Sequence, residues 1–64
     1  MTRMNKAVYL QSMGENIVWE YKVGKNQGRI FFLEINGQKF KRTPADQMVA
    51  NKIIDEMFNA YSSN

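Results

Sequence analysis

Two turn signals in the second half of the chain constrain its fold more than any other feature. Asn36-Gly37 tolerates the positive φ angles of a two-residue type I′ turn, so it predicts a β-hairpin. Thr43 can cap a helix with its hydroxyl, Pro44 suits the first helical position, and Asp46 stands where the acid of a capping box would. Together these signals predict a strand, a tight turn, a short strand and then a helix.

The chain before this hairpin reads as further strands. Its glycines separate short runs that alternate apolar and polar residues with the period of half-buried strands. Gly14-Glu15 predicts a type II′ turn between the first two runs. We therefore expect a single α+β domain, residues 1–64, with a four-stranded antiparallel meander sheet and one C-terminal helix packed on one face. The expected strands span residues 6–12, 16–23, 29–35 and 38–42, and the expected helix spans residues 44–61.

Cross-strand matching assigns residues to the two faces of this sheet. The predicted hairpin places Glu34 opposite Lys39, an acid facing a base. An odd-length connection between the second and third strands keeps their apolar residues on one face, whereas an even-length one would bury Glu20 and Lys22. The predicted core face consists of Val8, Leu10, Ile17, Trp19, Tyr21, Phe31, Leu33, Ile35 and Phe40.

The composition argues against enzymatic, metal and membrane functions. The chain has 64 residues with no cysteine and no histidine, so it lacks the commonest general base, the commonest metal ligand and any disulfide. The glycine loop at 24–28 leads into a strand, whereas a phosphate-binding loop leads into a helix. Residues 1–13 do not resemble a secretory signal, and no segment approaches the ~20 apolar residues of a membrane span. We expect a cytoplasmic protein that is not an enzyme and has no cofactor, metal or membrane partner.

Positive charge is concentrated in the strand region. Residues 1–44 carry eight Lys or Arg against three acids, a balance of +5, and residues 45–64 carry one lysine against three acids. The face opposite the core would present aromatic rings among lysines, a combination that suits single-stranded nucleic acid because bases stack on rings and cations bind phosphates. The candidate nucleic-acid-binding residues are Tyr9, Lys22, Lys25, Arg29, Phe32, Lys39, Lys41 and Arg42.

Two other interpretations of this face remain open. It can be an ordinary half-exposed sheet face with Glu–Lys ladders, in which aromatic residues occur because they favour strands. Alternatively, Val18, Ile30 and Phe32 can form a patch for a partner protein. The lysines of residues 39–42 can also protect an edge strand against pairing with another chain.

The predicted helix has an apolar arc about half its circumference wide. One sheet face would not cover all of this arc, and a chain this short without disulfides or a metal often gains burial by self-association. We therefore expect a homodimer in which Ile54, Phe58 and Tyr61 form the interface.

The segment from Gly37 to Asp46, GQKFKRTPAD, resembles part of a known family. Four strands and a C-terminal helix resemble the single-stranded-DNA-binding fold of the transcriptional positive cofactor four family, the Pur-alpha repeat and the Whirly proteins. In the first family a similar basic strand ends in a polar-Pro-acid helix cap, although Gln47 stands near where that family often has an aromatic residue. The three-strand-plus-helix arm-binding domains of tyrosine recombinases look similar too. Both resemblances imply nucleic-acid binding, and the first also implies a dimer.

We therefore expect a non-enzymatic, regulatory module that binds single-stranded DNA or RNA with low sequence specificity. The alternative is a small regulatory or inhibitory protein of the kind that mobile elements encode, with another protein as its partner. Its basis is the short chain and the surplus apolar surface at Met48, Ile54 and Phe58.

Overall fold

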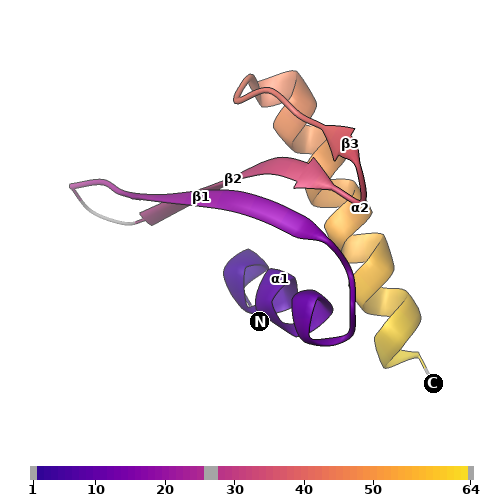
Figure 1. Cartoon of the computed structure of the whole chain (residues 1–64). Coiled ribbons are helices and arrows are strands. Elements are labelled where there is room, and N and C mark those ends of the chain that lie inside the picture. The colour runs from indigo at the N-terminus through magenta and orange to yellow at the C-terminus, as the bar shows by residue number, and fades with distance from the viewer. Residues whose placement is uncertain (1, 26–27, 64) are drawn as a thin grey trace.

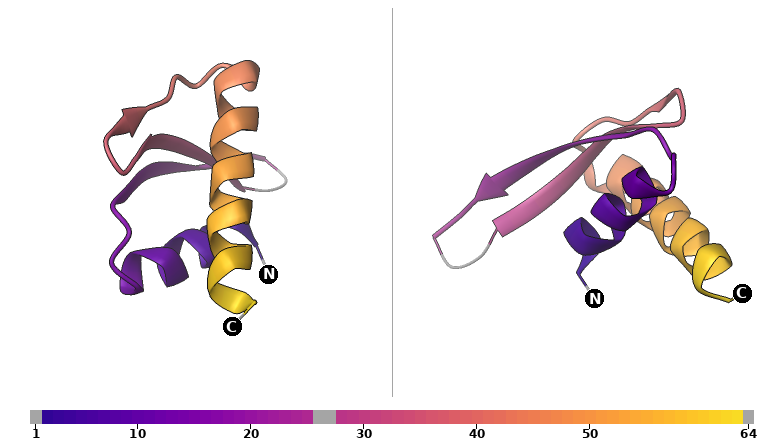
Figure 2. Two further views of the ribbon diagram at one scale, coloured as in Figure 1. Left: turned by 90° about the vertical axis from the view of Figure 1, so that its right-hand side faces the viewer. Right: turned by 60° about the horizontal axis from the view of Figure 1, so that its bottom comes forward.

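The computed structural model describes residues 2–25 and 28–63, which form two helices and a three-stranded antiparallel sheet with β2 in the middle. The elements in chain order are α1 (Arg3–Ser12), β1 (Ile17–Val23), β2 (Gly28–Ile35), β3 (Gln38–Lys39) and α2 (Pro44–Ser62). Both helices lie on one side of the sheet, and the β1–β2 hairpin extends beyond them (Figures 1 and 2). The expected fold of four strands and one helix is therefore wrong, and the topology behind the cofactor four, Pur-alpha and Whirly resemblance is not the one observed.

The segment predicted as the first strand, residues 6–12, belongs to helix α1. Thr2 caps this helix by accepting a hydrogen bond from the Asn5 amide at 3.1 Å. Ala7 and Leu10, three residues apart, are fully buried, whereas Val8 is 51% exposed. The apolar run is too short for its period to separate a strand from a helix, and the helical spacing describes it correctly.

Gly14 ends α1 and does not form the predicted hairpin turn. Its φ of +100° lies in the region that favours glycine. The Gly14 amide donates to the Gln11 carbonyl and the Glu15 amide donates to the Leu10 carbonyl, both at 3.0 Å. These two bonds form a Schellman motif, which satisfies carbonyl groups that the helix end would leave unpaired.

The two turn signals of the second half are confirmed. Asn36 and Gly37 both have positive φ, at 48° and 90°, and Glu34 pairs with Lys39. The helix predicted over 44–61 is α2, with Thr43 as its N-cap. The strand predicted over 38–42 is shorter than expected, because only Gln38–Lys39 pairs with β2 as a strand.

A β-bulge at Leu33 changes which side chains of β2 face the core. Val18 pairs with Glu34 but Trp19 pairs with Phe32, so Leu33 is an extra residue in the ladder. The bulge reverses the alternation for the first half of β2, which turns Phe32 inward and leaves Phe31 on the opposite face. Val23 pairs with Gly28, so the connection between β1 and β2 has an even number of residues. An even-length connection was expected to bury Glu20. The bulge prevents this burial, because it shifts the register of β2 by one residue.

The core lies between the sheet and the two helices. Its buried apolar residues come from α1, β1, β2, α2 and the segment between β3 and α2: Ala7, Leu10, Ile17, Phe32, Ile35, Phe40, Ala50 and Ile54. Trp19 packs against this cluster and is half-buried. Val8 and Tyr21, both predicted to lie in the core, are about half exposed, at 51% and 47%.

The side chain of Gln47, which belongs to α2, forms the hydrogen bonds to the Phe32 backbone that a longer third strand would form. Its Oε1 accepts from the Phe32 amide at 2.9 Å, and its Nε2 donates to the carbonyls of Phe32 and Lys41 at 2.8 and 2.7 Å. The strand predicted over 38–42 therefore does not continue past Lys39, because a side chain from α2 occupies the place where Lys41 would face Phe32. The sequence pattern placed Gln47 on the polar side of the helix, yet it is buried.

Within residues 2–25 and 28–63, neither helix combines the length and the apolar character that crossing a bilayer requires.

Candidate nucleic-acid interface

The sheet face opposite the helices, which we call the outer face, is uncovered along its length (Figure 2). In β1, Ile17 is buried and the last three residues are all exposed, with Val23 at 82%, because the distal end of the hairpin projects beyond both helices. Of the residues predicted for this face, the ladder places Val18, Glu20, Lys22, Glu34 and Lys39 there.

The bulge exchanges the aromatic residue that this face was predicted to present. Phe32 was the candidate for base stacking, but its side chain is fully buried in the core. Phe31 takes its place on the outer face, opposite Glu20, and is partly exposed. The pairing of Val23 with Gly28 brings Phe31 to the face of Glu20 and Lys22, and the sequence alone carried no signal of this register.

A hollow of about 540 Å³ lies at the distal end of the hairpin, and we call it the basic hollow. Three cationic side chains border it: Lys22 from β1, Lys25 from the connection and Arg29 from β2. Lys22 and Arg29 are direct cross-strand neighbours, and Phe31 forms part of the lining. The hollow therefore combines an aromatic ring with a surplus of positive charge and contains no acidic lining residue among those described.

Glu20 neutralises part of the charge on the rest of the outer face. Its carboxylate accepts a hydrogen bond from the Arg42 guanidinium and lies 3.5 Å from the Lys22 ammonium. The Arg42 hydrogen bond, together with the charges of Arg42 and Lys22, lowers the pKa of Glu20, so this carboxyl is ionised at neutral pH. Of the three cations that border the basic hollow, Lys25 and Arg29 have no ion pair among residues 2–25 and 28–63, so they are more available to an anion than Lys22 is.

The remaining predicted nucleic-acid-binding residues lie outside the basic hollow. Tyr9 is in α1, where its ring meets the Phe58 ring edge to face with centroids 5.4 Å apart. Lys39 faces Glu34 across the β2–β3 ladder. Lys41 is exposed beyond β3, where its amide donates to the Asp46 carboxylate at 2.7 Å.

The residues predicted for a dimer interface contact α1 and its C-terminal turn. Ile54 is fully buried, and Phe58 packs on Tyr9. The Tyr61 hydroxyl donates to the Glu15 carboxylate at 3.1 Å, and partial burial together with this bond raises the pKa of Tyr61. The expected uncovered arc on the helix was the reason for predicting a homodimer, and α1 covers that arc. Pairing of two copies stays a prediction without this support.

The described residues contain no group of three or more acidic, histidine or cysteine side chains that could hold a metal ion. Comparisons with protein-family models, with curated proteins and with solved structures return no match. Function is therefore inferred from the residues of the basic hollow and of the outer face.

Proposed function

We propose that the chain is a non-enzymatic module that binds single-stranded DNA or RNA, with low sequence specificity, at the distal end of the β1–β2 hairpin. The observation that carries this proposal is the basic hollow, whose lining combines Lys22, Lys25 and Arg29 with Phe31. Cations bind phosphates of any sequence, and an aromatic ring stacks on any base, so this arrangement favours a nucleic acid without selecting its sequence.

Unpaired strands suit this site better than a duplex does. The bases of a duplex are stacked on each other and cannot stack on the ring of Phe31, whereas those of a single strand can turn outward. The acidic Glu20 and Glu34 on the same face disfavour a polyanion lying across the whole sheet. The contact is therefore expected to be short and to centre on the end of the hairpin.

Binding to labelled oligothymidine, measured by fluorescence anisotropy, tests the proposal. Three cations contacting phosphates predict a slope of roughly −2 in a plot of log affinity against log salt concentration. A duplex of the same length should bind more weakly. The absence of binding to single-stranded DNA and RNA at about 50 mM salt would reject the proposal.

Charge reversal at the hollow should weaken binding selectively. We expect Lys25→Glu to lower the affinity for oligothymidine about tenfold or more, because a phosphate contact is lost and a repulsive charge replaces it. Lys52→Glu changes the net charge equally at an exposed position of α2 that borders neither cavity, so it is the matched control. Equal losses in the two variants would show that only the net charge matters.

Replacing the ring of Phe31 should reveal whether a base stacks on it. Phe31→Leu keeps an apolar side chain but removes the aromatic face, and we expect it to weaken binding by about 1–3 kcal/mol per stacked base. Thermal unfolding followed by circular dichroism would show that the variant is folded under the binding conditions. An unchanged affinity in a folded Phe31→Leu protein would limit the site to its phosphate contacts.

A further inference from the structure

One edge of β2 has no neighbouring strand along part of its length. β3 pairs with Glu34 and Ile35, the Phe40 amide donates to the Leu33 carbonyl at 3.0 Å, and Gln47 provides the next partner, at Phe32. Backbone groups alternate sides along a strand, so the amide and carbonyl of Ile30 point to the same side as those of Phe32. In the described part of the chain no strand lies beside Ile30 on that side. These two groups can therefore pair with an added strand.

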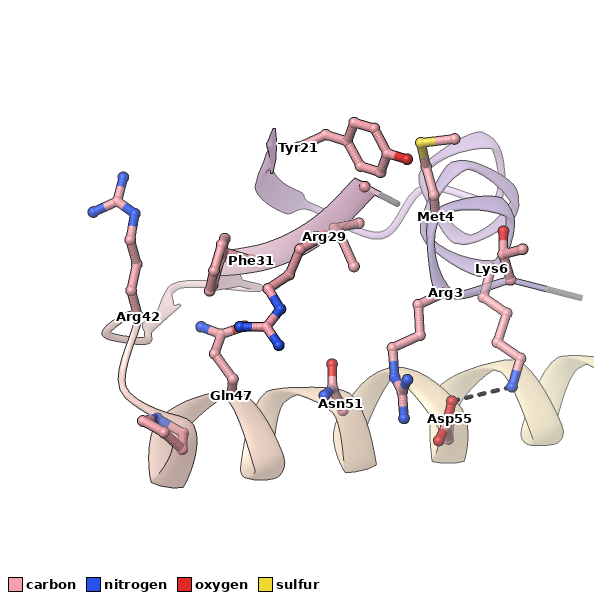
Figure 3. Close-up of a pocket in the computed structure, with 14 residues that line it drawn as sticks. Arg3, Met4, Lys6, Tyr21, Arg29, Phe31, Arg42, Gln47, Asn51 and Asp55 are labelled. Atoms are coloured by element: carbon pink, nitrogen blue, oxygen red, sulfur yellow. Dashed lines mark hydrogen bonds and ion pairs between the residues drawn. The ribbon is translucent and has the colours of Figure 1, made fainter. Parts of the chain in front are cut away.

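A cleft of about 800 Å³ lies along this edge, and we call it the edge cleft. Its floor is one face of α2, with Gln47, Asn51 and Asp55 spaced four residues apart, and α1 lies at one end with Arg3 (Figure 3). Its volume is within the range of about 300–1,000 Å³ that is usual for ligand sites.

The edge cleft has an excess of positive charge. Arg3, Lys6, Arg29 and Arg42 line it against the single acid Asp55. Lys6 is bound to Asp55 at 3.1 Å and Arg42 is bound to Glu20. Arg3 and Arg29 have no ion pair among residues 2–25 and 28–63, and both extend over the α2 floor (Figure 3). A ligand that contributes carboxylates would balance these two charges.

Asn51 adds a hydrogen-bond acceptor without a donor. Its Oδ1 is buried and has no partner in the described part of the chain. A buried acceptor of this kind is costly unless a donor reaches it. Together, Asn51 and Ile30 offer two acceptors and one donor along the edge cleft. A peptide backbone provides both donors and acceptors, whereas a phosphodiester backbone provides acceptors only.

We propose that the edge cleft binds an extended, acidic segment of another protein, which adds to β2 as a short strand beside Ile30. In such β-augmentation, backbone hydrogen bonds hold the segment and alternate side chains determine specificity. Carboxylates of the segment meet Arg3 and Arg29, and one of its amides donates to Asn51. The proposal does not rest on nucleic-acid binding. Because Gly28, Arg29 and Phe31 border both sites, the test uses residues that border only one.

Three labelled octapeptides test the recognition by fluorescence anisotropy. The first alternates valine and glutamate, the second is the same peptide methylated at every backbone nitrogen, so that neither edge can donate a hydrogen bond, and the third alternates valine and lysine. We expect the first peptide to bind and the other two to bind about tenfold more weakly or worse, because each lacks one required contact. Equal binding of the methylated peptide would overturn the proposal, since attraction between opposite charges alone would then explain the binding.

A pair of asparagine variants tests the position of the site. Asn51→Leu removes an unpartnered acceptor, so we expect an unchanged or higher melting temperature and at least about tenfold weaker binding of the acidic peptide. Asn59→Leu makes the same change at an exposed position of α2 and should leave peptide binding unchanged. Lys25→Glu, which weakens nucleic-acid binding, should also leave it unchanged. The proposal would be overturned if Asn51→Leu left peptide binding unchanged, or if Lys25→Glu abolished it.

Hydrogen exchange at the Ile30 amide provides a second readout. The acidic peptide should slow this exchange, whereas the amide should exchange readily in the protein alone. Slow exchange that depends on protein concentration without any peptide would identify a second copy of the chain as the occupant, and would overturn the proposal.

Discussion

Replacing Phe32 with alanine is expected to lower the free energy of unfolding by about 3–5 kcal/mol. Phe32 is one of the largest fully buried side chains, and it lies where the sheet meets both helices. Its removal leaves a cavity that the small core can fill only partly. A domain of this size has a total stability of about 3–10 kcal/mol, so much of the protein would be unfolded at room temperature. Urea titration at low temperature, followed by Trp19 fluorescence, would measure the loss.

The neighbouring phenylalanine is the matched control for this prediction. Phe31→Ala deletes the same atoms one residue away, on the partly exposed outer face, so we expect a clearly smaller loss of stability. Without the bulge at Leu33 the two side chains would exchange faces and the order of the two losses would reverse. A larger loss for Phe31→Ala than for Phe32→Ala would therefore contradict the observed register. Phe32→Leu, with a smaller cavity, keeps the comparison measurable if the alanine variant does not fold.

The second large loss of stability is expected when Gln47 is replaced. Gln47→Leu has a similar volume but cannot bind the Phe32 amide or the carbonyls of Phe32 and Lys41. Each buried backbone group that loses its partner costs about 1–3 kcal/mol, and we expect a total loss of about 2–4 kcal/mol because water can reach some of them. Gln38→Leu, at an exposed position of β3, is the control and should change stability by less than about 0.5 kcal/mol. Chemical denaturation of both variants measures the difference.

A glutamate at this position should make the stability depend on pH. Gln47→Glu keeps an acceptor for the Phe32 amide but loses both donors, and burial raises the pKa of the new carboxyl above its unfolded value. A raised pKa in the folded state means that the variant loses stability as pH rises through that pKa, so it should be more stable near pH 4 than near pH 7, relative to the wild type. A stability difference that does not change with pH would show that the carboxyl is not buried.

Local chemistry explains the elements that could be predicted. The Asn36-Gly37 turn depends on the backbone angles that these two residues tolerate, and the start of α2 depends on the Thr43 hydroxyl and on Pro44. Such signals act within a few residues, so the surrounding fold does not need to be known. The Glu34–Lys39 pairing follows from the turn alone and was predicted correctly for the same reason.

The candidate site could be predicted only in part. Of the eight candidate residues, Lys22, Lys25 and Arg29 border one hollow, because they lie on two neighbouring strands and the connection that joins them. The aromatic partner was wrong by one residue, since a single bulge exchanges the faces of Phe31 and Phe32. A bulge depends on how the whole strand packs, and alternation alone carries no sign of it.

The first helix and the role of Gln47 depend on contacts between residues far apart in the chain. Residues 6–12 alternate well enough for a strand, and they are helical because Ala7 and Leu10 pack against the sheet and α2. A glutamine on a helix is normally a surface residue, and Gln47 is buried because β3 ends at Lys39 and leaves the backbone of Phe32 without a partner. Turn and capping chemistry is local and can be read from neighbouring residues. Pairing of backbone groups between distant segments depends on the assembled fold, and in this chain that pairing determines which side chains reach the surface.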